Sequence, residues 1–174
     1  MKRYAVLAVA VLSVLVGACG GSDSDSEPAN GPGVSTAAGI DETTSEPTRP
    51  EFIDEVDAIC ADFGDSEEVQ NAMDLAMKAD DSAEAASHFD LLVRESDKAM
   101  NDVSSVEVPS SVQDEFDSYL DAEEELGILL ADMADAVRDG NINEFFAIGE
   151  KMKAPSDRSE RIAKSLGFKV CAAD

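Results

Sequence analysis

The chain has 174 residues, of which 38 are acidic and 13 are basic, so its formal net charge is −25. A protein this acidic repels phosphate backbones and anionic lipid headgroups, which argues against nucleic-acid binding and against a basic membrane-surface role. Hydrophobic residues make up 44% of the chain, too large a share for a protein that is disordered throughout. The length suits one modest domain.

The N-terminus has the layout of a secretory signal. Lys2 and Arg3 precede a mostly apolar run over residues 4–16, which is shorter than the roughly 20 residues that a membrane-spanning helix needs. The next residues, Val16–Cys19, read Val-Gly-Ala-Cys and resemble the lipobox of bacterial lipoproteins. This resemblance implies cleavage before Cys19 and a lipid anchor on that residue, at the outer face of the cytoplasmic membrane. An ordinary cleaved signal with an unrelated cysteine is the alternative.

The composition changes sharply after the signal. Residues 1–18 form the expected signal peptide, and their removal takes away two bases and no acid, so the mature chain carries a net charge of −27. Residues 19–49 are rich in Ser, Asp, Thr, Pro and Gly and are predicted to form a lipidated, disordered tether. Residues 50–174 hold all seven Phe and are predicted to form the folded domain.

The apolar residues of this domain recur at helical spacing, and no stretch keeps the alternation that predicts a strand. We therefore predict an all-α fold, an antiparallel four-helix bundle with one extra short helix. The predicted segments are Thr48–Gly64, Glu67–Lys78 (short and weak), Asp80–Pro109, Ser110–Gly140 (capped by Ser110 with Gln113) and Asn141–Leu166 (capped by Asn141 with Glu144 and kinked at Pro155).

Two cysteines remain once Cys19 carries lipid, namely Cys60 and Cys171. An even pair outside the cytoplasm favours one disulfide. Two free buried thiols are the alternative. A catalytic pair of cysteine and histidine is disfavoured, because the single histidine, His88, lies in the middle of a different predicted helix.

Three short motifs mark the folded domain: Asp57-Ala58-Ile59-Cys60 early in the first helix, Val108-Pro109 before the third, and Leu166-Gly167-Phe168 leading to Cys171. Together they resemble the small cysteine-bracketed helical lipoproteins of actinobacteria. The resemblance covers residues 50–174 and implies a helical fold and a disulfide bridge. It implies no catalytic residue, because most proteins of this kind have no assigned activity.

The sequence contains no recognisable nucleophile with its base, no glycine-rich phosphate loop and no metal-ligand set. We therefore expect no cofactor and no enzymatic activity. Glu84 and His88 share a helix face, but without further ligands this pair is expected to be solvated. Glu123-Glu124-Glu125 is also expected to form a solvated face, with a weak cation site as the alternative. The methionines at 73, 77, 100, 133 and 152 are predicted to pack in the core.

Charge is distributed unevenly along the domain. Residues 50–150 hold 29 acids and 4 bases, whereas residues 151–174 hold 3 acids and 6 bases. These basic side chains either relieve the repulsion of acidic neighbours or form a docking surface for an acidic partner or an envelope polymer. The candidate residues for such a surface are Lys151, Lys153, Arg158, Arg161 and Lys164.

Together these features predict a monomeric, lipid-anchored, non-enzymatic bundle that binds or scaffolds a protein or polymer of the cell envelope. One alternative is a module that binds a small ligand or a divalent cation through its negative field. A second alternative is an enzyme of unrecognised type.

Overall fold

The computed structural model describes residues 46–172, which form five helices and, over that range, no strand. The helices are α1 (Arg49–Gly64), α2 (Glu67–Lys78), α3 (Ser82–Ser104), α4 (Gln113–Arg138) and α5 (Ile142–Leu166). The predicted all-α helical bundle is confirmed. The antiparallel four-helix arrangement stays a prediction, since α1 and α2 are separate helices. The predicted signal, Cys19 and nearly all of the tether lie outside the described residues.

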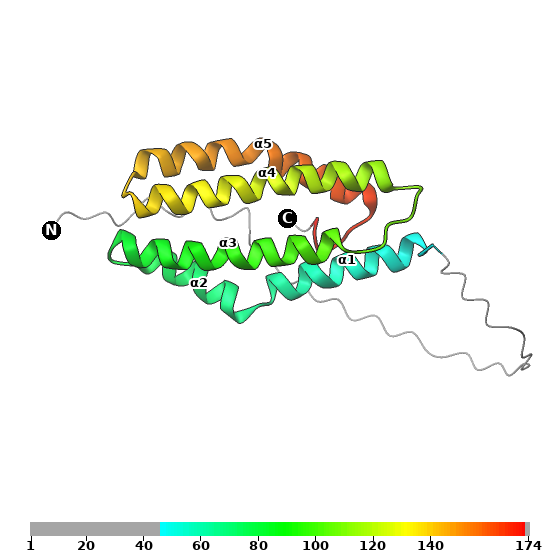
Figure 1. Cartoon of the computed structure of the whole chain (residues 1–174), viewed down its shortest axis with the longest axis horizontal. Coiled ribbons are helices and arrows are strands. Elements are labelled where there is room, and N and C mark those ends of the chain that lie inside the picture. Colours follow the sequence, from blue (N-terminus) through cyan, green and yellow to red (C-terminus); the bar gives the residue numbers. More distant parts are fainter. Residues whose placement is uncertain (1–45, 173–174) are drawn as a thin grey trace, which may run out of the picture.

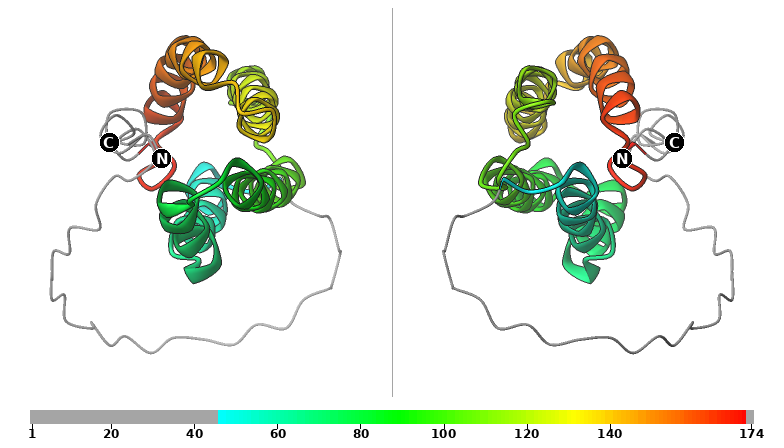
Figure 2. Two further views of the ribbon diagram at one scale, coloured as in Figure 1. Left: turned by 90° about the vertical axis from the view of Figure 1, so that its left-hand side faces the viewer. Right: turned by 90° about the vertical axis from the view of Figure 1, so that its right-hand side faces the viewer.

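The three long helices α3, α4 and α5 lie side by side, while α1 and α2 follow one another along α3 (Figure 1). Seen along the bundle, α4 and α5 form one layer and α1, α2 and α3 form the other (Figure 2). Within residues 46–172, no helix combines the length and the apolar character that a membrane span requires.

Two hydrophobic clusters join the two layers. The first connects α1, α3, α4 and α5 around Phe52, Phe116 and Leu166, each at most 1% exposed, and includes Val103 of α3. The rings of Phe52 and Phe116 meet edge to face with centroids 5.0 Å apart. The second connects α2, α3, α4 and α5 around Phe89, Met133 and other buried residues. Each long helix therefore contributes to a shared core at both ends of the bundle.

Two helix starts follow the predicted capping signals. The backbone N–H and the hydroxyl of Thr48 both donate to the carboxylate of Glu51, at 2.9 and 2.7 Å. These hydrogen bonds hold the pKa of Glu51 below its ordinary value. At α5, the side-chain oxygen of Asn141 accepts from the N–H of Glu144 at 3.3 Å. Both caps satisfy donors that a helix start leaves without an intrahelical partner.

The predicted cap of α4 by Ser110 with Gln113 is wrong. The helix begins at Gln113 with Val112 in the N-cap position, and the Gln113 amide donates instead to Asp117 at 2.8 Å. A turn in which the Val112 N–H donates to the Pro109 carbonyl delivers Val112 into the first hydrophobic cluster. Burial of this valine sets the start of the helix, and the Ser110 N–H donates to Glu46.

One face of α1 binds the C-terminal segment that follows α5. The face carries Arg49, Ile53, Asp57 and Cys60, which recur at steps of four, four and three residues. The Arg49 guanidinium donates to the last carbonyls of α5, those of Ser165 at 2.9 Å and Leu166 at 3.0 Å. Such carbonyls lack intrahelical partners, so Arg49 acts as a cap supplied by another helix.

Cys60 and Cys171 lie at disulfide distance, with their Cα atoms 5.4 Å apart, as the sequence predicted. The two residues are 111 positions apart in the chain. In the chain-entropy account, closing a loop of this length stabilises the folded state by about 4–5 kcal/mol. The bridge fixes the short segment after α5 between α5 and α1, where Figure 2 shows it.

Candidate functional site

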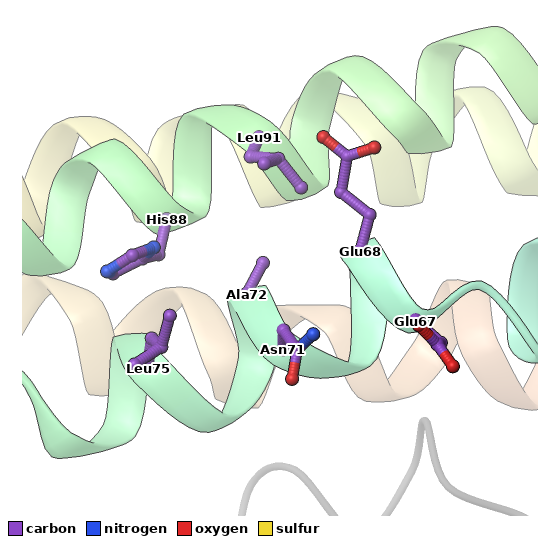
Figure 3. A pocket seen from close by; sticks show the side chains of 7 residues that line it. All are labelled: Glu67, Glu68, Asn71, Ala72, Leu75, His88 and Leu91. Atoms are coloured by element: carbon purple, nitrogen blue, oxygen red, sulfur yellow. The ribbon is translucent and has the colours of Figure 1, made fainter.

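An open hollow of about 500 Å³ lies between α2 and α3 (Figure 3). It is largely open to solvent and so differs from the clefts that bury most of the surface of a small ligand. The residues that line it come from α2 and α3: Glu67, Glu68, Asn71, Ala72, Leu75, His88 and Leu91.

Ala72 lies among larger side chains along the α2 side of the hollow (Figure 3), and it is itself buried in the second hydrophobic cluster. On one side of it Leu75 lies close to His88, and on the other Glu68 reaches toward α3 (Figure 3). Arg94 of α3 pairs with Glu68 at 3.5 Å, which ties the two helices together beside the hollow.

The hollow combines apolar and acidic groups. Leu75 is 47% exposed, an unusual exposure for a leucine that faces a neighbouring helix. Leu91 and Ala72 extend the apolar surface, and the glutamates of the first turn of α2 stand at its rim. Because Arg94 already pairs with Glu68, part of the negative charge at this rim is neutralised within the protein.

His88 and Leu75 were not predicted as site residues. Among residues 46–172, no group of three His, Cys, Asp or Glu side chains is placed to hold a metal ion. Glu84 lies on the exposed first turn of α3, whereas His88 lines the hollow. The available sequence signal was Leu75, an apolar residue of α2 outside the face formed by Val69, Met73 and Ala76, which pack in the second hydrophobic cluster.

The five basic candidates of α5 are largely engaged with acids. Three form ion pairs: Lys153 with Glu150 at 2.7 Å, Arg158 with Glu125 of α4 at 2.9 Å, and Lys164 with Glu160. The Arg161 Nε donates to the Asp157 carbonyl, and Lys151 is exposed. These contacts favour the interpretation that the basic segment relieves acidic repulsion. The docking surface for an acidic partner stays a prediction.

Glu123 does not belong to a solvated face, contrary to the prediction for Glu123-Glu124-Glu125. Glu124 and Glu125 are exposed, but Glu123 points between α4 and α5, where the hydroxyl of Ser159 donates to it. Burial raises the pKa of Glu123 above its ordinary value, although the bond from Ser159 opposes the shift. Burial likewise raises the pKa of the neighbouring Tyr119.

The predicted core packing is correct for Met133, which is buried in the second hydrophobic cluster, and for Met73 and Met152, which pack against it. Met100 is partly buried but belongs to neither cluster. Met77 is 48% exposed at the end of α2, because α2 is short and its last turn extends past the core residues Val69 and Ala72.

Comparisons of the chain with protein-family models, with curated proteins and with solved structures found no match. The resemblance to actinobacterial lipoproteins therefore rests on the short motifs of the chain itself.

Proposed function

We propose that the protein is a lipid-anchored, non-enzymatic helical bundle that binds a partner at the outer face of the cytoplasmic membrane. The observation that carries the binding role is the hollow between α2 and α3, with its exposed Leu75 and its glutamate rim. An open apolar surface edged with acids fits a partner segment that carries aliphatic side chains next to lysine or arginine.

The anchor and the charge support this role together. A lipid on Cys19 would hold the domain to the membrane through the tether of residues 19–49, whose mean reach is roughly 30 Å. The net charge of −27 on the mature chain repels an anionic lipid surface over about 8 Å in physiological salt. The domain would then stand off the bilayer with its α2–α3 surface open to other envelope molecules.

The anchor is tested by the substitution Cys19→Ser. Without the thiol that accepts the lipid, we expect the protein to move from the membrane fraction to the soluble fraction or to stay unprocessed. Membrane fractionation and metabolic labelling with a fatty acid measure both results. Normal lipid labelling of the Cys19→Ser variant would show that the anchor is assigned to the wrong residue.

The binding surface is tested by photocrosslinking in intact cells. A photoreactive amino acid at position 75 should give a discrete adduct, because this side chain faces the hollow. The same amino acid at position 128 is the control, since Ile128 is 58% exposed on α4, which does not line the hollow. Absence of an adduct at position 75, or equal adducts at both positions, would count against the α2–α3 surface.

A further inference from the structure

Asp57 and Cys60 lie one turn apart on α1 and bind the same short segment. The Asp57 side chain is only 9% exposed, and its carboxylate accepts hydrogen bonds from three consecutive backbone N–H groups. Lys169 donates at 2.9 and 3.1 Å, Val170 at 2.9 Å and Cys171 at 3.3 Å. Cys171 is thus held twice, through its backbone by Asp57 and through its sulfur by Cys60.

Three successive N–H groups converge on one anion only when the backbone between them curves into a concave turn. Binding of the carboxylate therefore selects one conformation of residues 169–171, and in that conformation the Cys171 side chain lies against α1 beside Cys60. The hydrogen bonds of Asp57 with the chain after α5, and of Arg49 with the last carbonyls of α5, involve no sulfur atom.

We propose that Asp57 is a positioning residue for the disulfide: its carboxylate holds Cys171 beside Cys60 in the dithiol form and so promotes closure of the bridge. The inference does not depend on the proposed function, because it concerns contacts within the domain. Loss of the anchor or of the partner surface would leave it unchanged.

The chemical step is thiol–disulfide exchange with a small disulfide such as oxidised glutathione. The thiolate of one cysteine attacks the glutathione disulfide, which forms a mixed disulfide and releases one glutathione thiolate. The thiolate of the second cysteine then attacks the protein sulfur of the mixed disulfide and releases the second glutathione. The protein loses two electrons and two protons, and the glutathione disulfide is reduced to two thiols. Asp57 acts on the second, intramolecular attack by raising the effective concentration of one sulfur at the other.

The experiment equilibrates the full chain in buffers of reduced and oxidised glutathione. Alkylation followed by mass spectrometry reports the thiol state of Cys60 and Cys171 separately from that of Cys19. Asp57→Asn replaces two acceptor oxygens by one oxygen and an amide donor that opposes the converging N–H groups. We expect the equilibrium constant for bridge formation to fall about tenfold. The matched control is Asp54→Asn, an exposed acid on the same helix, which should change the constant less than about twofold.

A second variant acts from the other side of the contact. Val170→Pro removes one donor N–H from an exposed position and leaves α1 untouched. Val170→Pro should also lower the equilibrium constant for bridge formation. In the double variant with Asp57→Asn, the fold decrease in this constant should be smaller than the product of the two single decreases, because both substitutions remove the same hydrogen bond. This variant carries the test if Asp57→Asn does not fold.

Two results would overturn the proposal. The first is an equilibrium constant in Asp57→Asn or Val170→Pro that equals that of the Asp54→Asn control. The second is a fall in the constant that, in both Asp57→Asn and Val170→Pro, merely follows loss of the whole fold, measured as a parallel loss of helical circular dichroism in the reduced variants. Faster amide hydrogen exchange confined to residues 169–171, with helicity retained, is the result that supports positioning by Asp57.

Discussion

At the scale of single residues, the buried polar groups of the domain are matched by partners from distant parts of the chain. The carboxylate of Asp57 meets backbone N–H groups more than 100 positions away, and that of Glu123 meets Ser159. Among the described residues, no buried side-chain nitrogen or oxygen lacks a hydrogen-bond partner. Burial of an unpaired polar group costs about 1–3 kcal/mol, so these partners are needed for helices to pack at those positions.

Glu123 allows a prediction of pH dependence. Because burial raises its pKa in the folded protein, the folded state favours the protonated carboxyl more than the unfolded chain does. Its stabilising contribution is therefore complete below the ordinary glutamate value of 4.5 and is lost as the pH rises through the raised value. Glu123→Gln keeps an acceptor for Ser159 and removes the charge, so we expect the free energy of unfolding at pH 7 to increase by about 1 kcal/mol.

Denaturant titrations of wild type and Glu123→Gln at pH 7 and at pH 4 measure this effect. The gain should be present at pH 7 and small at pH 4, where the wild-type carboxyl is largely protonated. Glu124→Gln is the matched control, because this neighbouring side chain is exposed. A stabilisation of Glu123→Gln that is independent of pH, or equal in both variants, would contradict the assignment of the effect to burial.

At the scale of elements, the end of α5 is set by Gly167. This residue has φ of 95°, and the N–H groups of Gly167 and Phe168 both donate to the Ala163 carbonyl. The pattern is a Schellman-type C-cap, which requires a left-handed residue at this position. The reversal directs Phe168 into the first hydrophobic cluster and sends residues 169–171 along α1.

Gly167→Ala is expected to lower the free energy of unfolding by about 1–2 kcal/mol. The left-handed backbone disfavours a β-carbon, and such an atom would also lie 3.2 Å from Cδ1 of Ile53. The matched control is Gly127→Ala inside α4, where nothing lies within 4 Å of an added β-carbon. There alanine should stabilise the protein by about 0.5–1 kcal/mol through its helix propensity. Thermal and denaturant unfolding compare the two, and effects of the same sign would refute the role given to Gly167.

At the scale of the whole molecule, like charges oppose folding more than ion pairs favour it. Most side chains of the observed ion pairs are substantially exposed, for example Lys78 with Asp74 and Arg138 with Asp90. Exposed pairs of this kind contribute at most about 1 kcal/mol each. The 32 acids and 10 bases of residues 50–174 give the domain a net charge of −22, by contrast, and this charge on a compact body produces repulsion that the unfolded chain can relieve by expanding.

Salt should therefore stabilise this protein. Raising the ionic strength from 0.01 to 0.1 M shortens the Debye length from about 30 to about 10 Å, which screens repulsion across the bundle, and we expect Tm to rise by about 5 °C. Lys151→Glu removes one positive charge and adds one negative charge at an exposed site, so its Tm should be lower at low salt and should increase more steeply with salt. Differential scanning calorimetry measures both slopes. A Tm that is constant or falls with salt would show that repulsion is not the dominant electrostatic effect.

The sequence by itself determined the helices and the cysteine pair. Capping residues, apolar spacing and helix stops act within a few residues of one another, so α1, α2 and α5 lie close to their predicted ranges. The start of α3 is also close to the predicted one, but the helix ends at Ser104, before the predicted stop at Pro109. The pairing of Cys60 with Cys171 followed from counting the cysteines. The start of α4 was misplaced because burial of Val112 outweighed the local capping signal of Ser110.

Only the tertiary structure decided which polar side chains are buried and where the surface is hollow. Glu123 and Glu124 are chemically identical neighbours, yet one faces α5 and the other faces solvent because they point in different directions from α4. Asp57 is one of many acids in the sequence, and its role depends on a turn more than 100 residues later. The hollow at Ala72 likewise depends on which residues of α3 lie opposite α2. Such contacts join residues far apart in the chain, and no local pattern encodes them.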